Sequence, residues 1–199
     1  MSNLLIQNAT MVLPDTTVIG DLLIMDGIIS SIRPGGGLVA SEGVATIDAT
    51  GLYLLPGMID PQVHFRDPGQ PEKEDLYTGS CAAASGGVTS FLDMPNNVPS
   101  QTTLASMHEK IETGNRRCVT NFGFFIGATE SNVEELQKAV GTPDAPIAIP
   151  GICGIKIFMG SSTGDLLVND SDALEIIFSN TAGLIACLLY TSDAADECD

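Results

Sequence analysis

The sequence predicts an α/β fold built on a parallel β-sheet and preceded by a small all-β segment. From residue 56 onward, short apolar runs that suit buried strands alternate four times with segments that suit helices. This alternation is typical of a parallel sheet that helices cover on both faces. Before residue 56, short apolar runs are separated only by turns. The periodicity fits a doubly wound sheet and a barrel equally well, so the architecture stays open at this point.

The first segment, residues 1–55, is expected to form a small β module. The Asp26-Gly27 dipeptide between two apolar runs is its strongest hairpin signal. A Pro-Gly-Gly-Gly loop at residues 34–37 precedes the later strands. The expected strands are residues 4–9, 17–19, 21–25, 28–32, 46–49 and 51–55.

The second segment, residues 56–186, is expected to hold four strand–helix units. Apolar runs with turn residues at their ends define the strands, and N-cap residues mark helix starts. The expected strands are residues 55–60, 88–94, 121–126 and 152–159, and the expected helices are residues 72–84, 104–113, 131–136 and 170–179. Residues 181–186 resemble the start of a fifth strand.

The charge balance excludes several classes of partner. The chain of 199 residues carries 25 acidic and 8 basic residues, a net charge of −17. Such a protein repels phosphate backbones and anionic lipid, so neither nucleic acid nor a membrane is an expected partner. The five cysteines have no CxxC spacing, and the sequence begins without a basic, apolar leader. We therefore expect a cytoplasmic protein with free thiols.

The first group of candidate site residues is Gln62, His64 and Arg66, at the C-terminal end of the first buried strand. Side chains two apart on a strand face the same way, and ligands gather at this end of parallel strands. An imidazole can bind a metal, and a guanidinium can hold a carboxylate by two hydrogen bonds. The spacing alone also fits a hydrogen-bonded loop histidine beside a surface arginine, because one histidine is not a metal site.

Two further candidates follow later strands. Lys156 is flanked on both sides by apolar strand residues, where a bare ammonium is costly to bury. Either its stem carries the charge to an edge, or the amine is used chemically. One such use is carbamylation by carbon dioxide, which yields a carboxylate able to bridge two metals. Asn96 lies in a Pro- and Asn-rich turn after the second strand, ordinarily just a turn, but its position makes it a candidate substrate contact.

These three stretches, in this order, resemble the dihydroorotase family of the amidohydrolase superfamily. The resemblance is carried by PGMIDPQVHFRDPG at residues 56–69, GGVTSFLDMPNNVPSQTT at residues 86–103 and GIKIFMGSSTGDLLV at residues 154–168. It extends from the N-terminal strands to about Ala186. It implies a metal-dependent-hydrolase TIM (β/α)8 barrel, of which about the first four β/α units are present. It also implies that residues 1–55 are the N-terminal part of a small β-sandwich.

The resemblance implies reversible hydrolysis of the cyclic amide of dihydroorotate to N-carbamoyl-aspartate, in pyrimidine biosynthesis. By position, His64 matches the second histidine of a His-x-His metal pair, and Lys156 matches a carboxylated lysine that bridges metals. Arg66 and Asn96 match residues that hold the substrate carboxylate. The implied cofactor is one or two Zn²⁺ ions, and a metal-held hydroxide attacks the ring carbonyl while zinc polarises its oxygen.

The sequence departs from the family pattern in two places. Gln62 stands where the first histidine of the pair is expected, and an amide oxygen is a weaker zinc ligand than imidazole. Two more histidine ligands and a catalytic aspartate, expected on later strands, do not occur after Ala186. The only other histidine, His108, is expected on the exposed face of the second helix.

The last residues, 187–199, resemble a translated sequencing adaptor, in which Cys-Leu-Leu-Tyr-Thr-Ser corresponds to residues 187–192. A divergent natural C-terminus is the alternative. We therefore expect a C-terminally truncated reading frame with a non-native tail, inactive by itself.

Three other functions compete with the dihydroorotase reading. Allantoinase and dihydropyrimidinase act on related cyclic amides, but Arg66 favours a substrate with a free carboxylate. A non-catalytic pseudo-dihydroorotase that scaffolds a transcarbamoylase is the second alternative, with Gln62 marking lost metal binding. A plain α/β binding module is disfavoured because three motifs agree in order and strand position. The sequence does not define the oligomeric state, and a homo-oligomer is compatible with it.

Overall fold

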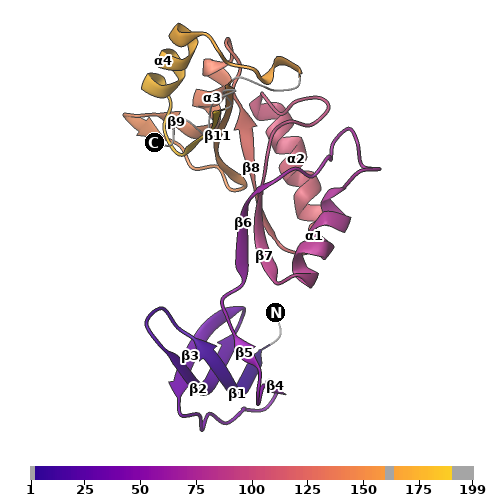
Figure 1. Ribbon diagram of the computed structural model, residues 1–199, viewed down its shortest axis with the longest axis vertical. Helices are drawn as coiled ribbons and strands as arrows, with labels where there is room; N and C mark the ends of the chain where they lie inside the picture. The colour runs from indigo at the N-terminus through magenta and orange to yellow at the C-terminus, as the bar shows by residue number, and fades with distance from the viewer. Residues whose placement is uncertain (1–2, 160–163, 190–199) are drawn as a thin grey trace. The chain divides into compact units, whose positions relative to one another are not determined.

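The structure, a computed structural model, describes residues 3–159 and 164–189. The chain divides into two compact units, Met1–Pro56 and Gly57–Asp199, and each is described by itself (Figure 1).

The first unit is a five-stranded β-sheet. Its strands are β1 (Leu4–Val12), β2 (Thr17–Met25), β3 (Ile28–Pro34), β4 (Ala45–Asp48) and β5 (Tyr53–Leu54). The first three form an antiparallel meander, and β4 and β5 both run parallel to β1. The predicted hairpin is confirmed, since Asp26 (φ 52°) and Gly27 (φ 80°) join β2 to β3 with the positive φ angles of a tight two-residue turn.

Among its described residues, the second unit holds a sheet of five parallel strands. They are β6 (Met58–Val63), β7 (Val88–Asp93), β8 (Asn121–Gly127), β11 (Ile152–Met159) and β12 (Ile185–Leu189). Their spatial order, β12-β11-β8-β7-β6, is simply their order in the chain. A doubly wound sheet reverses its strand order at a switch point, whereas a barrel adds each strand beside the last. The topology therefore resolves the open choice, and the unit is a partial (β/α)8 barrel.

In the described part of the chain, four α-helices connect these strands (Figure 1). They are α1 (Leu76–Ser85), α2 (Leu104–Arg117), α3 (Val133–Val140) and α4 (Ser171–Asn180). A short hairpin of β9 (Gly141–Thr142) and β10 (Ala145–Pro146) and a 3₁₀ turn, η1 (Gly164–Leu166), complete the unit.

The predicted start of the first helix at residue 72 is wrong. The helix begins at Leu76 because Asp75 is its N-cap, and the Asp75 carboxylate accepts a hydrogen bond from the Thr78 backbone N–H at 2.7 Å. The Thr78 hydroxyl interacts in return with the Asp75 backbone N–H, which completes a capping box. The second helix runs beyond its predicted end, as far as Arg117.

The helices all pack on one face of the sheet, which corrects the expectation of helices on both faces for the described part of the chain. One apolar cluster joins helix residues to strand residues. Its members include Leu76, Met107, Leu136 and Ile177 from the helices and Phe91, Phe124, Ile126, Ile155 and Ile157 from the strands. Strand side chains alternate between faces, so Lys156, between Ile155 and Ile157, faces away from the helices. His64 does the same, because its neighbours Val63 and Phe65 pack against the cluster.

The last described strand crosses the predicted boundary at Ala186. Strand β12 continues to Leu189, and its residues pair in parallel with β11, Ala186 opposite Lys156. The rest of the segment predicted to be non-native, residues 190–199, lies outside the described residues. Within the described ranges, no helix combines the length and the apolar character needed to span a membrane.

Candidate active site

The structure brings His64 and Asn96 together at the ends of neighbouring strands. His64 follows β6 and Asn96 follows β7, and their Nδ1 and Oδ1 atoms lie 2.7 Å apart. An amide oxygen only accepts hydrogen bonds, so in this contact Nδ1 carries the proton. The Nε2 lone pair of His64 is then available to a metal, the arrangement in which a second contact fixes the tautomer of a ligand histidine.

Arg66 joins the same cluster. Its Nη1 donates to the backbone carbonyl oxygen of Asn96 at 3.4 Å, and its side chain is half-buried. The guanidinium therefore lies beside Asn96, with further N–H groups able to bind an anion. Three of the predicted site residues, His64, Arg66 and Asn96, are thus neighbours.

Gln62 is placed differently from these three. It lies within β6 and is exposed, and its backbone N–H donates to Asp60 Oδ1 at 3.1 Å. Among the described residues, its side-chain amide makes no hydrogen bond to His64. His108, the other histidine, is exposed on α2, as predicted.

Lys156 is buried on β11, with only 2% of its surface exposed. Its Nζ lies 5.2 Å from the centre of the Phe158 ring. Within residues 3–159 and 164–189, this nitrogen forms neither a hydrogen bond nor an ion pair. Burial lowers the pKa of this amine, because the low-dielectric surroundings disfavour its charged form. Lys156 and His64 do not stand on neighbouring strands, because β7 and β8 lie between β11 and β6.

Three of these residues carry atoms that a metal ion could bind. Within the described ranges, no three His, Cys, Asp or Glu side chains gather as a metal-binding group. The donors that this chain offers are the free Nε2 of His64, the amide oxygen of Gln62 and, once carboxylated, Lys156. The buried amine of Lys156, which has no polar partner within residues 3–159 and 164–189, fits this role, because a neutral amine is the form that reacts with carbon dioxide.

Sequence reasoning missed a buried ion pair behind the cluster. Lys110 on α2 donates from Nζ to Asp93 Oδ2 at 2.7 Å and to Asn97 Oδ1 at 2.6 Å. The Lys110 and Asp93 side chains are 1% and 0% exposed. Burial raises the pKa of Asp93 and lowers that of Lys110, and their mutual attraction opposes both shifts. Helical spacing could have indicated that Lys110 is buried, because Met107, Lys110 and Gly114 share the buried face of α2.

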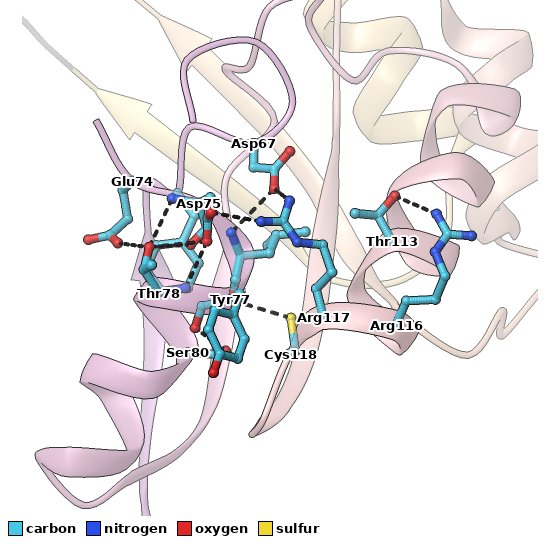
Figure 2. Close-up of polar contacts among 12 residues, drawn as sticks. Asp67, Glu74, Asp75, Tyr77, Thr78, Ser80, Thr113, Arg116, Arg117 and Cys118 are labelled. Carbon is cyan, nitrogen blue, oxygen red and sulfur yellow. Dashed lines mark hydrogen bonds and ion pairs between the residues drawn. The ribbon is translucent and has the colours of Figure 1, made fainter. Parts of the chain in front are cut away.

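A second ionic contact ties the loop after β6 to the ends of two helices. The Arg117 guanidinium lies between Asp67 and Asp75 (Figure 2). Its N–O distances to their carboxylates are 2.6 and 2.7 Å. Asp67 belongs to the β6 loop, Asp75 caps α1, and Arg117 ends α2. Hydrogen bonds and this charge hold the pKa of Asp75 below its usual range, with the Thr78 backbone N–H contributing most.

Comparison with known proteins identifies relatives of this chain. Residues 53–144 match the model of the Amidohydrolase family. A dihydroorotase of Methanosarcina mazei is 36% identical over 158 residues, which cover 79% of this chain and 32% of that protein. A dihydroorotase of Methanothermobacter thermautotrophicus is 49% identical over 102 residues, 51% of this chain and 23% of that protein.

Relatives with other activities match as well. An allantoinase of Deinococcus radiodurans is 34% identical over 161 residues, 80% of this chain and 34% of that protein. Among solved structures, the L-hydantoinase of Arthrobacter aurescens superimposes with a TM-score of 0.74 at 29% identity, over 89% of this chain and 38% of that one. The chain spans about a third of the length of these curated relatives.

Proposed function

We propose that this chain, whose residues 53–144 match the Amidohydrolase family, is part of a cytoplasmic dihydroorotase of pyrimidine biosynthesis. The relatives act on different cyclic amides, so the choice among substrates rests on the chain's own residues. The observation that carries the proposal is Arg66 beside Asn96 and His64. Dihydroorotate has a free carboxylate that a guanidinium can bind, whereas allantoin and dihydropyrimidines lack one.

In this proposal the substrate carboxylate binds to Arg66 and the side chain of Asn96. This contact orients the ring so that its amide carbonyl faces the β6 end of the sheet, where His64 lies. A half-buried site reduces competition from water for the guanidinium. A substrate that is bound through a group remote from the reacting bond is held in one orientation, which favours the reaction.

The zinc ions would be held by His64 Nε2, by carboxylated Lys156 and, more weakly, by Gln62. Zinc supplies an activated water and polarises the carbonyl oxygen of the substrate. Carboxylation of Lys156 forms an N–C bond between the neutral amine and carbon dioxide and releases one proton. Burial supports this step, because it favours the neutral amine whose lone pair attacks the carbon.

Two alternatives have specific support. Similarity to allantoinases and to an L-hydantoinase favours another cyclic amidohydrolase activity. Gln62 in place of a histidine favours a protein without catalytic metal that scaffolds a transcarbamoylase. Free thiols at Cys81, Cys118 and Cys153 support a reducing compartment for any of these functions.

The test is a substrate panel with the complete reading frame that contains these residues, purified after growth with zinc. We expect one to two zinc ions per chain and hydrolysis of dihydroorotate, with little hydrolysis of allantoin or hydantoin. Turnover of allantoin or hydantoin in place of dihydroorotate contradicts the proposed substrate. Metal-free, inactive protein that co-purifies with a transcarbamoylase supports the scaffold instead.

A further inference from the structure

We propose that Lys110, buried behind the site on α2, is a positioning residue that holds the loop after β6 against the loop after β7. It thereby sets the spacing of His64, Arg66 and Asn96. This inference rests on the proposed function, because it assigns a role within that same site.

Both polar groups of the Phe65 backbone are held by the two side chains that Lys110 contacts. Asp93 Oδ1 accepts a hydrogen bond from the Phe65 N–H at 2.9 Å. Asn97 Nδ2 donates to the Phe65 carbonyl oxygen at 3.0 Å and to the Asp67 carbonyl oxygen at 3.3 Å. Phe65 stands between His64 and Arg66 in the chain, so the peptide groups on both sides of it are fixed.

Lys110 is the common partner of Asp93 and Asn97, and we call these three side chains the clamp. Its Nζ contacts Asp93 and Asn97 at 2.7 and 2.6 Å and lies 4.8 Å from the centre of the Phe124 ring. Asn97 is next to Asn96, whose side chain contacts His64. A movement of Lys110 would therefore displace both the strand-end loop that carries His64 and the turn that carries Asn96.

The cost of the buried charge argues for a positioning role. Replacing a buried ion pair with apolar groups of similar volume is often neutral or stabilising. Lys110 lies beside Phe124 and one helical turn after Met107, so an apolar side chain at this position would have apolar neighbours. An ammonium adds directed hydrogen bonds to two acceptors at once, which an apolar side chain does not provide.

The loops also pack directly on each other. A Cβ atom at Gly69 (φ 110°) would clash with the carbonyl oxygen of Val98, and the Val98 N–H donates to the Pro68 carbonyl oxygen at 3.3 Å. The two loops are therefore in close contact. Small changes in the clamp are expected to reach the site.

The experiment compares Lys110→Met and Asn97→Ala with the control Lys138→Met in the complete protein. Lys138 is also a helical lysine paired with a carboxylate, Glu135 at 2.6 Å, but its side chain is 56% exposed and lies on α3. We expect the KM for dihydroorotate to rise about 10- to 100-fold in both test variants, as for a displaced positioning group, and to stay unchanged in the control.

A double variant separates positioning from stability. Lys110→Met leaves a buried, unpaired carboxylate, so adding Asp93→Asn should restore the melting temperature while keeping the acceptor for the Phe65 N–H. We expect the KM to remain raised in the double variant. Recovery of KM together with the melting temperature overturns the proposal. Asn97→Ala keeps the ion pair intact, and an unchanged KM in that variant overturns the proposal as well.

Amide hydrogen exchange without substrate distinguishes this inference from the proposed function. We expect exchange at Phe65 to accelerate at least about tenfold in Lys110→Met and Asn97→Ala, relative to the Ile126 amide in the core of the sheet. If the wild type hydrolyses no dihydroorotate but Phe65 loses protection, the substrate assignment fails and the clamp stands. Unchanged protection of Phe65 overturns the clamp whatever the substrate is.

Discussion

At the scale of single residues, the contact between His64 and Asn96 explains how a turn after β7 can control a histidine after β6. The proton on Nδ1 points to the Asn96 amide oxygen at 2.7 Å, which leaves Nε2 free. Partners of this kind orient a ligand histidine and raise its basicity. In the proposed function, the site therefore depends on Asn96 in two ways, through the substrate carboxylate and through the imidazole.

Replacing Asn96 with Leu removes the acceptor for His64 Nδ1 while roughly keeping side-chain volume. We expect zinc affinity to fall about 10- to 100-fold, the usual effect of losing a partner of a metal-bound histidine. Titration against a fluorescent chelator measures this change. Asn115→Leu, at an exposed position on α2, serves as the control, and equal zinc affinity in the two variants would count against the assigned role of Asn96.

The sequence predicts some of these residues and not others, for physical reasons. Two-residue spacing on a strand places His64 and Arg66 on one face without further information. Asn96 is 32 residues from His64 in the chain, and their contact depends on which strands are neighbours. Lys110 was missed because a lysine on an amphipathic helix usually points to solvent, and only its spacing from Met107 shows the buried side.

At the scale of elements, helix α1 is defined by its cap. Asp75 accepts from the Thr78 N–H at 2.7 Å and pairs with Arg117 at the end of α2. The segment before it forms a turn, although its residues suit a helix, because the cap fixes where the first helical residue stands. The Arg117 side chain thus joins the end of α2 to the N-cap of α1 and to Asp67 of the β6 loop (Figure 2).

Asp75→Ala removes both the cap and the ion pair. We expect it to lower the free energy of unfolding by about 1–2 kcal/mol at neutral pH, most of it from the cap. Because folding lowers the pKa of Asp75, its contribution is complete above its unfolded value of 3.8 and is lost as the pH falls through the lower folded value. Urea unfolding of the complete protein should show the difference at pH 7 and a smaller one below pH 3.8. A difference that does not depend on pH would contradict the carboxylate's role.

The alternation of elements is well predicted, because buried parallel strands are continuous apolar runs with turn residues at their ends. Helix α4 shows this, since Asp170 caps it and it starts one residue after the predicted position. The pairing order of the strands is not written in any local segment. The barrel topology is therefore defined by the spatial order of the strands. β6, β7, β8, β11 and β12 lie side by side in chain order.

At the scale of the whole molecule, the described sheet has two strands with a neighbour on one side only, β6 and β12. Apolar side chains of β6 are exposed, including Met58 (60%) and Ile59 (66%). A barrel removes such edges by closing on itself, whereas an open apolar edge promotes aggregation.

We therefore expect residues 1–199 expressed alone to aggregate or to unfold without a cooperative transition. The complete reading frame should unfold cooperatively, because further strands would cover both edges. Size-exclusion chromatography and a thermal melt followed by near-UV circular dichroism measure this difference. A monomeric peak and a sharp melting transition for residues 1–199 alone would contradict it.

The most direct test of the central claim, that Arg66 recognises a substrate carboxylate, is kcat/KM for dihydroorotate in the complete protein and in its Arg66→Met variant. We expect a decrease of about 10- to 100-fold, mostly in KM, because a charged hydrogen bond to the carboxylate is lost. Arg116→Met, whose side chain is 66% exposed on α2, should keep wild-type values. Equal kcat/KM in wild type and Arg66→Met would contradict the claim.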